Sequence, residues 1–431
     1  MKQCLSLLAS LTLILLVGGC ASMKLTVKPE SPPLPVAQAA RTYASFWDAM
    51  DNVDLEYAQR HDSLAGQKEL AQATQAALDG KTDEAVEAAR KVWASSADSA
   101  TRHRSRELLE NLLFTRSRWK DILDVYERDT SAVDSDENMQ ALVKVYAAAP
   151  DEVTELPTAP DTTAITLNGV GLPTVEVTVN GHRQRFILDT GASVSVLSSD
   201  VARECGVTAA KETATAGTSN SKTVAIQAAV VDSVRWGKLL LRHHPVAVIE
   251  SSHLRVRLLG LLTIFKIDGI IGWNAIRELH LKISYRDKYA VVQAPQTRDG
   301  APRNLFDLGE PMVVLNDGHG SRFNFLLDTG ANVTSLGRSG LNKLPAQKFG
   351  KRRTLVGGAG GMESFRATVV PHLTLHTAGY ALEFANLRTS PEARSSGVKR
   401  DGILGSDVAR KGAITIDYLN GRFEYEQSAQ Q

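Results

Sequence analysis

One short motif occurs twice in this chain of 431 residues, each time at the end of an apolar run. The first copy, Phe-Ile-Leu-Asp-Thr-Gly-Ala, ends at Ala192, and the second, Phe-Leu-Leu-Asp-Thr-Gly-Ala, ends at Ala331. Each pattern predicts a buried strand that carries its Asp into a tight turn, where glycine permits close backbone approach. A single Asp-Thr-Gly is a weak signal because the tripeptide arises often by chance. The repeat strengthens it, since one chain then supplies two carboxyl groups.

The motif is one of several features that recur in the same order. Each copy is followed by a glycine-bearing turn between β-like runs, which contains Gly217 in the first unit and Gly357, Gly358, Gly360 and Gly361 in the second. Each unit then carries Asp-Gly-Ile-Ile-Gly or Asp-Gly-Ile-Leu-Gly before a short helical stretch and a further strand. This order predicts an internal duplication of a β unit of roughly 130 residues.

These repeated motifs resemble those of the aspartic peptidases, specifically the retropepsin-like branch, over residues 164–427. The resemblance implies that Asp189 and Asp328 form a catalytic pair that hydrolyses protein or peptide substrates without a cofactor or metal. It also implies that Thr190 and Thr329 reach across to the backbone of the opposite lobe. The resemblance implies that the active-site turns are supported by Gly191, Ala192, Gly330 and Ala331. It places the flaps at Gly217, Gly357, Gly358, Gly360 and Gly361. It implies that Ile271, Gly272, Leu404 and Gly405 buttress the catalytic turns.

Within this family, retroviral enzymes pair two identical chains, whereas pepsin-like enzymes fuse two lobes in one chain. The present chain resembles the fused form, yet each lobe keeps its own flap, unlike pepsin. The resemblance therefore leaves open whether one or both flaps close over substrate. The linker of about ten residues between the lobes can span the ~30 Å that a fusion needs, so we expect a monomeric active unit.

Two carboxyl groups about 3 Å apart cannot both ionise cheaply, so they share one proton, as in aspartic proteases generally. The ionised partner takes a proton from a water molecule between them, and that water attacks the peptide carbonyl. The residues do not indicate which Asp is the acid. Ala192 and Ala331 stand where pepsin-like enzymes often carry Ser, so no hydroxyl there favours the charged form. We therefore expect a pH optimum from mildly acidic to near neutral.

Three functions compete for such a chain. It could be an active endopeptidase, a catalytically silent peptide-binding module, or a scaffold lipoprotein that the β lobes only stabilise. Decay would be expected to remove an Asp, Thr or Gly from at least one copy of the motif, and both copies are intact. The sequence therefore favours the active endopeptidase.

The first residues are typical of a bacterial lipoprotein signal peptide: Met1-Lys2, an apolar run from Leu5 to Val17, and small residues before Cys20. The run is shorter than the ~20 residues of an ordinary transmembrane helix. The pattern predicts a signal peptide over residues 1–19, a lipid on Cys20 that binds a membrane, and a proline-rich tether over residues 20–36. By likeness to known sorting patterns, Ala21 favours the outer membrane if the organism has one, and we expect the protein to face the periplasm. An uncleaved anchor is the alternative.

Residues 37–150 are rich in Ala, Leu, Glu and Arg, and their apolar positions recur at helical spacing. A helix, a tight turn at Gly80 and a second helix resemble tetratricopeptide-type pairs. A plain helical bundle fits equally well, and in either case we expect docking of a protein partner or spacing. The predicted fold class is multidomain α plus all-β: this helical domain, then two duplicated retropepsin/pepsin-like β lobes over residues 164–292 and 304–427.

The remaining candidates carry little chemistry. The net charge of +1 gives no reason to expect a nucleic-acid partner. His243 and His244 lack a second pair at ligand spacing, so we expect an exposed strand position rather than a metal site. Cys205 should be a small buried apolar residue. The apolar stretch Leu258–Phe265 should fill the core, with a substrate-pocket wall or packing on the helical domain as the alternative.

Overall fold

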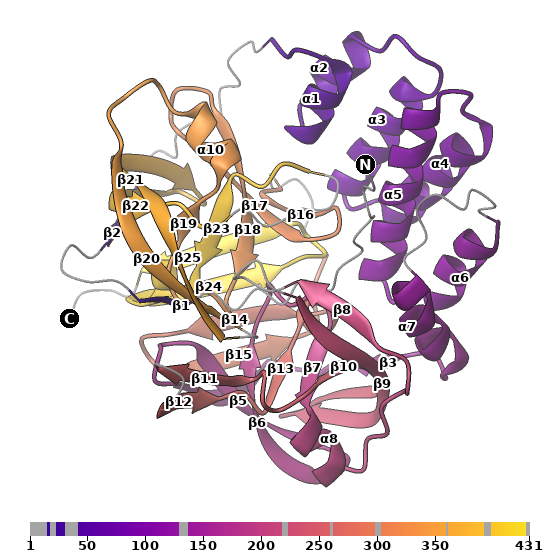
Figure 1. Ribbon diagram of the computed structural model, residues 1–431, viewed down its shortest axis with the longest axis vertical. Coiled ribbons are helices and arrows are strands. Elements are labelled where there is room, and N and C mark those ends of the chain that lie inside the picture. The colour runs from indigo at the N-terminus through magenta and orange to yellow at the C-terminus, as the bar shows by residue number, and fades with distance from the viewer. Residues whose placement is uncertain are drawn as a thin grey trace.

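The computed structural model describes residues 15–17, 23–30, 42–128, 137–217, 223–258, 262–297, 303–358, 361–391 and 398–427. Helices run along one side of two β lobes, with lobe one in magenta and pink and lobe two in orange and yellow (Figure 1). This arrangement confirms the predicted fold class, a helical domain followed by duplicated β lobes.

The helical domain consists of short helices joined by tight turns. Its helices are α1 (Phe46–Asp51), α2 (Leu55–Arg60), α3 (Gln67–Leu78), α4 (Thr82–Ser95), α5 (Ser99–Thr115), α6 (Trp119–Arg128) and α7 (Glu137–Ala148). Side chains cap several of them: Ser45 Oγ accepts a hydrogen bond from the N–H of Asp48 (3.1 Å), and Asp98 Oδ2 accepts one from that of Thr101 (2.8 Å). Gly80, between α3 and α4, has a φ of +78°, a conformation that suits glycine. The tetratricopeptide likeness stays a prediction.

Small apolar residues form the contacts between these helices. Ala71 in α3, Ala85 and Ala89 in α4, and Leu109 and Leu113 in α5 are all completely buried. Their positions recur every three to four residues, which places them on one face of each helix. None of the described helices is both long enough and apolar enough to cross a membrane.

Lobe one is built mainly from antiparallel strands. Its elements are β3 (Val153–Glu155), β4 (Asp161–Leu167), β5 (Pro173–Val179), β6 (His182–Leu188), β7 (Ser195–Ser198), α8 (Ser199–Glu204), β8 (Ala214–Gly217), β9 (Thr223–Trp236), β10 (Leu239–Ile249), β11 (Arg255–Leu258), β12 (Leu262–Lys266), β13 (Gly269–Ile271), α9 (Trp273–Ile276), β14 (His280–Ser284) and β15 (Tyr289–Gln293). In β5, Val175, Val177 and Val179 are buried while Glu176 is exposed, which is the period of two expected for a strand.

Lobe two repeats this plan. Its elements are β16 (Leu305–Asp307), β17 (Pro311–Asn316), β18 (Arg322–Asp328), β19 (Ser335–Leu336), α10 (Arg338–Lys343), β20 (Gly350–Gly358), β21 (Gly361–Thr377), β22 (Tyr380–Arg388), β23 (Gly402–Gly405), the 3-10 helix η1 (Ser406–Ala409), β24 (Gly412–Asp417) and β25 (Arg422–Gln427). In both lobes the strand that leads to the Asp lies antiparallel to one neighbour and parallel to another: β6 between β5 and β13, and β18 between β17 and β23.

A sheet shared between the lobes joins them. β14 of lobe one pairs antiparallel with β24 of lobe two, so that β25, β24, β14, β15 and β4 lie side by side. His280 Nδ1 lies 2.9 Å from Asp417 Oδ2 across this junction. A second junction involves the predicted apolar stretch 258–265, which falls in the β11–β12 hairpin; β11 lies beside β21 of lobe two.

The helical domain is attached to both lobes. Tyr146 in α7 donates a hydrogen bond to the carbonyl of Val246 in lobe one (2.9 Å). On lobe two, Lys399 forms an ion pair with Asp48 in α1 (2.6 Å). Apolar side chains of the helices and of both lobes also belong to one continuous core. The domain is therefore packed on the lobes rather than connected to them only by the chain.

Two strands precede the helical domain. They are β1 (Leu15–Val17), which pairs antiparallel with β20, and β2 (Lys24–Pro29), which pairs antiparallel with β22. β2 lies in the segment expected to be a tether, so this part of residues 20–36 is an edge strand of lobe two. Cys20 and residues 31–36 lie outside the described residues, and the signal peptide and the lipid stay predictions.

Candidate active site

Two strands bring Asp189 and Asp328 to the seam between the lobes. Asp189 directly follows β6, and Asp328 is the last residue of β18. β13 and β23 run parallel beside these strands: Ile271 pairs with the last residue of β6, and Leu404 pairs with the residue before Asp328. The N–H of Asp189 donates to the carbonyl of Ile271 (3.1 Å). The two predicted buttress segments therefore hold the strand ends in register.

The two threonines join the lobes through four buried hydrogen bonds. The hydroxyl of Thr190 donates to the carbonyl of Leu327 (2.6 Å), and that of Thr329 donates to the carbonyl of Leu188 (2.8 Å). Each hydroxyl also accepts a hydrogen bond from the N–H of the other threonine, at 3.0 Å in both directions. The structure thus places Thr190 and Thr329 as predicted, with each one bound to the backbone of the opposite lobe.

The glycine of each Asp-Thr-Gly turn lies against the carboxyl group of the Asp in the other lobe. A Cβ atom on Gly191 would lie 2.7 Å from Asp328 Oδ1, closer than real Cβ contacts, and one on Gly330 would collide with the carboxyl group of Asp189. Each Asp therefore lies against the turn of the opposite lobe. The negative charge of Asp189 therefore acts on Asp328 at close range across the seam. Both side chains are completely buried.

Burial dominates the electrostatics of this pair. It raises the pKa of Asp189 to about 7, although the N–H of Gly191 donates to Asp189 Oδ1 (2.8 Å) and favours the charged form. The pKa of Asp328 lies well above its ordinary range because of burial first and the negative charge of Asp189 second, and the backbone N–H of Ala331 opposes both only in part. The pair therefore retains a shared proton at neutral pH.

The buttress glycines allow the turns to close tightly. A Cβ atom on Gly272 would lie 2.7 Å from the backbone of Val194, and one on Gly405 would lie 3.0 Å from the carbonyl oxygen of Ala331. The residue after each glycine donates its N–H to the Asp-bearing turn, to the carbonyl of Ala192 at 2.7 Å in lobe one and to that of Ala331 at 2.8 Å in lobe two. Ala192 and Ala331 are buried.

The two flap hairpins have different neighbours. Gly217 ends β8, and the β8–β9 hairpin packs against α7 of the helical domain. Gly357 and Gly358 end β20, and Gly361 begins β21 with a φ of +103°. β20 pairs along its other edge with β1. Gly360 lies outside the described residues.

Sequence reasoning missed one part of the site, the polar side chains of His244, Glu152 and Ser195 near the Asp189 turn. His244 was expected to be an exposed strand residue, and that prediction is wrong: its side chain is completely buried between Glu152 and Ser195. His243 beside it is half-buried. Cys205 is buried, as predicted. The partners of His244 lie far from it in the chain, so no local pattern could have found them.

Comparison with known proteins agrees with this geometry. A family model described as aspartyl protease matches residues 175–275 and 312–408, one segment in each lobe. Each β lobe is therefore similar to an aspartyl protease domain, and the two domains follow each other in tandem.

One solved structure that matches part of the chain is the retropepsin-like aspartic protease from Rickettsia conorii. It is 18% identical in sequence, and the match covers 34% of this chain and 96% of that chain, with a TM-score of 0.22. That likeness is too distant to support statements about the site. No curated protein matches the chain.

The threonine hydrogen bonds lead to a stability prediction. Thr190→Val keeps the shape of the side chain but leaves the carbonyl of Leu327 and the N–H of Thr329 buried without their partner. We expect the free energy of unfolding to fall by about 2 to 4 kcal/mol, measured by urea denaturation. The exposed Thr166→Val in β4 is the matched control and should change little. Equal loss in the two variants would contradict the prediction.

Proposed function

We propose that this chain is an aspartic endopeptidase in which Asp189 and Asp328 activate a water molecule for attack on a peptide carbonyl. The observation that carries the proposal is the buried carboxyl pair, held together by the cross-lobe threonines and able to share one proton. General acid and general base are then present in one site, as hydrolysis of an amide requires.

The surroundings of the two acids favour distinct roles. The hydrogen bond from Gly191 stabilises negative charge on Asp189, whereas burial and the charge of Asp189 both disfavour ionisation of Asp328. Asp189 would accept a proton from the water molecule, and Asp328 would donate to the carbonyl oxygen of the substrate. The proton taken by Asp189 then passes to the leaving amine. The two titrations belong to the pair as a unit.

An extended peptide is the substrate form that the flaps support. In this chain, β20 of the lobe two flap already pairs along one edge with three consecutive apolar residues, Leu15–Val17. Loss of the signal peptide would leave that edge unpaired and able to bind a substrate strand through its backbone. Because the flap of lobe one packs against α7, we propose that the flap of lobe two is the one that closes over substrate.

The proposal includes the cellular setting. Cleavage before Cys20 and lipidation of that residue would hold the protease on the outer membrane, facing the periplasm. The support is the pattern of residues 1–20. Expression of the chain and of Cys20→Ser in a bacterium, followed by separation of membranes, tests this. Equal recovery of both chains in the membrane fraction would remove the lipid anchor from the proposal.

The complete burial of both acids favours a second candidate, a catalytically silent peptide-binding or scaffold lipoprotein. Residues 21–431 incubated with a diverse peptide library, with product termini read by mass spectrometry, separate the two functions. A peptidase produces new termini that are absent with the Asp328→Asn chain. The same products from both chains, or no products from either, would exclude the dyad mechanism.

The pKa shifts also predict the pH dependence of turnover. Catalysis requires Asp189 ionised and Asp328 protonated, so the rate should fall on the acidic side as Asp189 takes up its proton. Its pKa of about 7 in the closed site will decrease when substrate entry admits water. We expect kcat/KM to be maximal from mildly acidic to near-neutral pH. A maximum below about pH 3, under the ordinary range for Asp, would contradict this prediction.

A further inference from the structure

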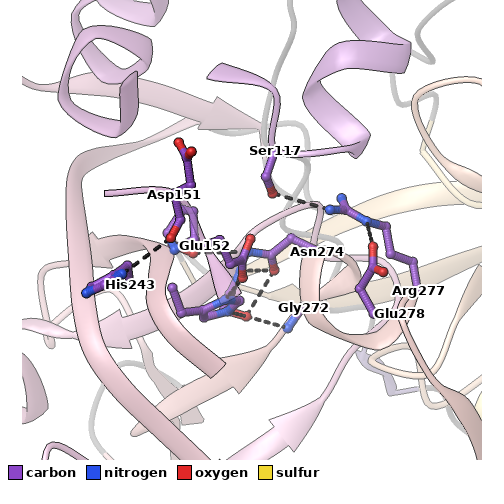
Figure 2. Close-up of polar contacts among 11 residues, drawn as sticks. Ser117, Asp151, Glu152, His243, Gly272, Asn274, Arg277 and Glu278 are labelled. Atoms are coloured by element: carbon purple, nitrogen blue, oxygen red, sulfur yellow. Dashed lines mark hydrogen bonds and ion pairs between the residues drawn. The ribbon is translucent and has the colours of Figure 1, made fainter. Parts of the chain in front are cut away.

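A network of polar groups connects Glu152, just after the helical domain, to Gly272 of the buttress segment (Figure 2). Glu152, in the segment between α7 and β3, pairs with Nδ1 of His244 in β10. Nε2 of the same ring lies 2.9 Å from Ser195 Oγ. Ser195 Oγ in turn accepts a hydrogen bond from the N–H of Gly272 (3.0 Å). The network thus ends on the buttress of the catalytic turn.

The hydrogen bonds of Ser195 indicate which groups in this network donate and which accept. Ser195 Oγ also lies 3.0 Å from Asn274 Oδ1, an atom that can only accept, because Asn274 Nδ2 donates to the carbonyl of Pro245 (3.0 Å). The single hydroxyl proton of Ser195 therefore goes to Asn274, and His244 must donate from Nε2. Nδ1 of the same ring faces the carboxyl group of Glu152, so a ring that donates from both nitrogens satisfies Glu152 and Ser195 together.

The surroundings of Glu152 agree with this assignment. Burial raises the pKa of Glu152, but the charge and hydrogen bond of His244, the charge of Arg277 and the hydroxyl of Ser117 outweigh it and lower the pKa overall. Arg277 lies at the end of α9, and Ser117 lies between α5 and α6 (Figure 2). The ion pair is therefore enclosed by groups from both the helical domain and lobe one.

The hydrogen-bond network of Glu152, His244 and Ser195 contacts the backbone on both sides of the Asp189 turn. Ser195 begins β7, six residues after Asp189, and its N–H donates to Asn274 Oδ1 (2.9 Å). Gly272, at the other end of the network, follows the residue whose carbonyl accepts the N–H of Asp189. A shift of the His244 ring would therefore move the backbone that sets the position of the Asp189 carboxyl group.

Lobe two makes the corresponding contacts with different residues. The N–H of Thr334 donates to Asp407 Oδ1 (2.9 Å), and the N–H of Gly405 donates to Thr334 Oγ1 (3.1 Å). Asp407 stands where lobe one has Asn274. The Asn in lobe one accepts the serine proton without adding a second charge beside Glu152. The duplicated lobes have thus diverged at this point.

The arrangement of Ser195, His244 and Glu152 also resembles a nucleophilic triad, but it cannot act as one. Ser195 is 2% exposed, and its oxygen accepts hydrogen bonds from Gly272 and from His244, so no lone pair faces a substrate. Its hydroxyl proton is directed to Asn274 rather than to the imidazole. The three side chains therefore hold backbone in place.

We propose that Glu152 and His244 are positioning residues for Asp189, and that they make the geometry of the catalytic turn depend on the placement of the helical domain. Glu152 is tied to the helical domain through the backbone, because α7 ends at Ala148 and Glu152 lies only four residues later. Movement of α7 would displace Glu152 and release His244. The expected effect on kcat rests on the proposed peptidase function. The expected effect on the position of the Asp189 turn rests on the hydrogen-bond network alone.

Variants at neighbouring positions provide a matched test. Glu152→Gln removes the charge, His244→Gln keeps a donor for Ser195, and His244→Ala removes the link. Asp151→Asn and His243→Asn, one position away on the same two segments, are the controls. We expect kcat to fall about 10- to 100-fold in His244→Ala, because small displacements of catalytic groups cost that much. KM should stay within about twofold, His244→Gln should recover part of the loss, and the controls should match the unaltered chain.

Hydrogen–deuterium exchange of the same chains measures positioning without turnover. In His244→Ala and Glu152→Gln, exchange should rise over residues 186–195 and 269–274 and stay unchanged over residues 325–334 of lobe two. Unchanged exchange and kcat in both variants would overturn the proposal, as would a rise spread evenly over both lobes. If the unaltered chain cleaves no peptide while exchange rises in lobe one alone, the proposed function fails and the positioning role stands.

Discussion

Asp328→Asn should reduce kcat for peptide hydrolysis by about 10⁴-fold and leave the chain folded. The amide has nearly the shape of a protonated carboxyl group, so the cross-lobe hydrogen bonds of Thr190 and Thr329 should persist. It cannot deliver a proton to the substrate, and it cannot exchange one with Asp189. General acid and general base catalysis each contribute about 10²- to 10⁴-fold, and the dyad supplies both. The measurement is peptide turnover with the same peptide for both chains.

Two controls make this result specific. Asp232→Asn changes an exposed acid on β9 and should keep full activity. A mixture of Asp189→Asn and Asp328→Asn chains should stay inactive, because the structure forms the pair within one chain. Activity regained in that mixture would mean that the dyad assembles between chains. Activity retained in Asp328→Asn alone would remove the dyad from the mechanism.

The same substitution should stabilise the protein at neutral pH. The pKa of Asp189 is about 7 in the folded chain, and that of Asp328 is raised well above its ordinary value, whereas both are near 3.8 when unfolded. Above pH 4 the unfolded chain releases protons that the folded chain retains, so stability decreases as pH rises toward 7. Asp328→Asn removes one of these acids. We expect the free energy of unfolding at pH 7 to increase by about 1 to 3 kcal/mol.

The pH dependence distinguishes this effect from better packing. Below about pH 3, both acids are protonated in the folded and unfolded chains, so the stability difference between Asp328→Asn and the unaltered chain should disappear. Urea denaturation at pH 3 and at pH 7 measures both values. A constant difference at the two pH values would show that the shared proton is not its cause. Asp232→Asn again serves as the control.

Sequence alone could predict the dyad because its determinants are local and repeated. An apolar strand, an Asp and a glycine turn form a continuous segment, and the second copy shows that Asp189 has a counterpart. The flap hairpins and the buttress segments follow the same logic. The threonine contacts came from the family resemblance, and the four hydrogen bonds between the lobes agree with it.

The features that sequence did not predict depend on residues brought together by folding. His244 looked like an exposed strand residue because its partners Glu152 and Ser195 are distant from it in the chain. β2 was read as part of a tether because it ends at Pro29, where a proline-rich segment begins, and nothing local indicated its pairing with β22. The packing of α7 on the flap of lobe one has no sequence signature, since its apolar face could equally contact other helices.

The sheet shared by β14 and β24 has a consequence for how such a molecule can change over time. Because each half completes the other's backbone pairing, a chain cut between the lobes should remain a noncovalent complex of two fragments. The molecule has the layout of two paired halves, while the covalent link fixes the ratio of these halves at one to one. Each half is then free to acquire its own substitutions. The halves already differ in this way: lobe one has Asn274 and His244 at its buttress, whereas lobe two has Asp407 at the position of Asn274.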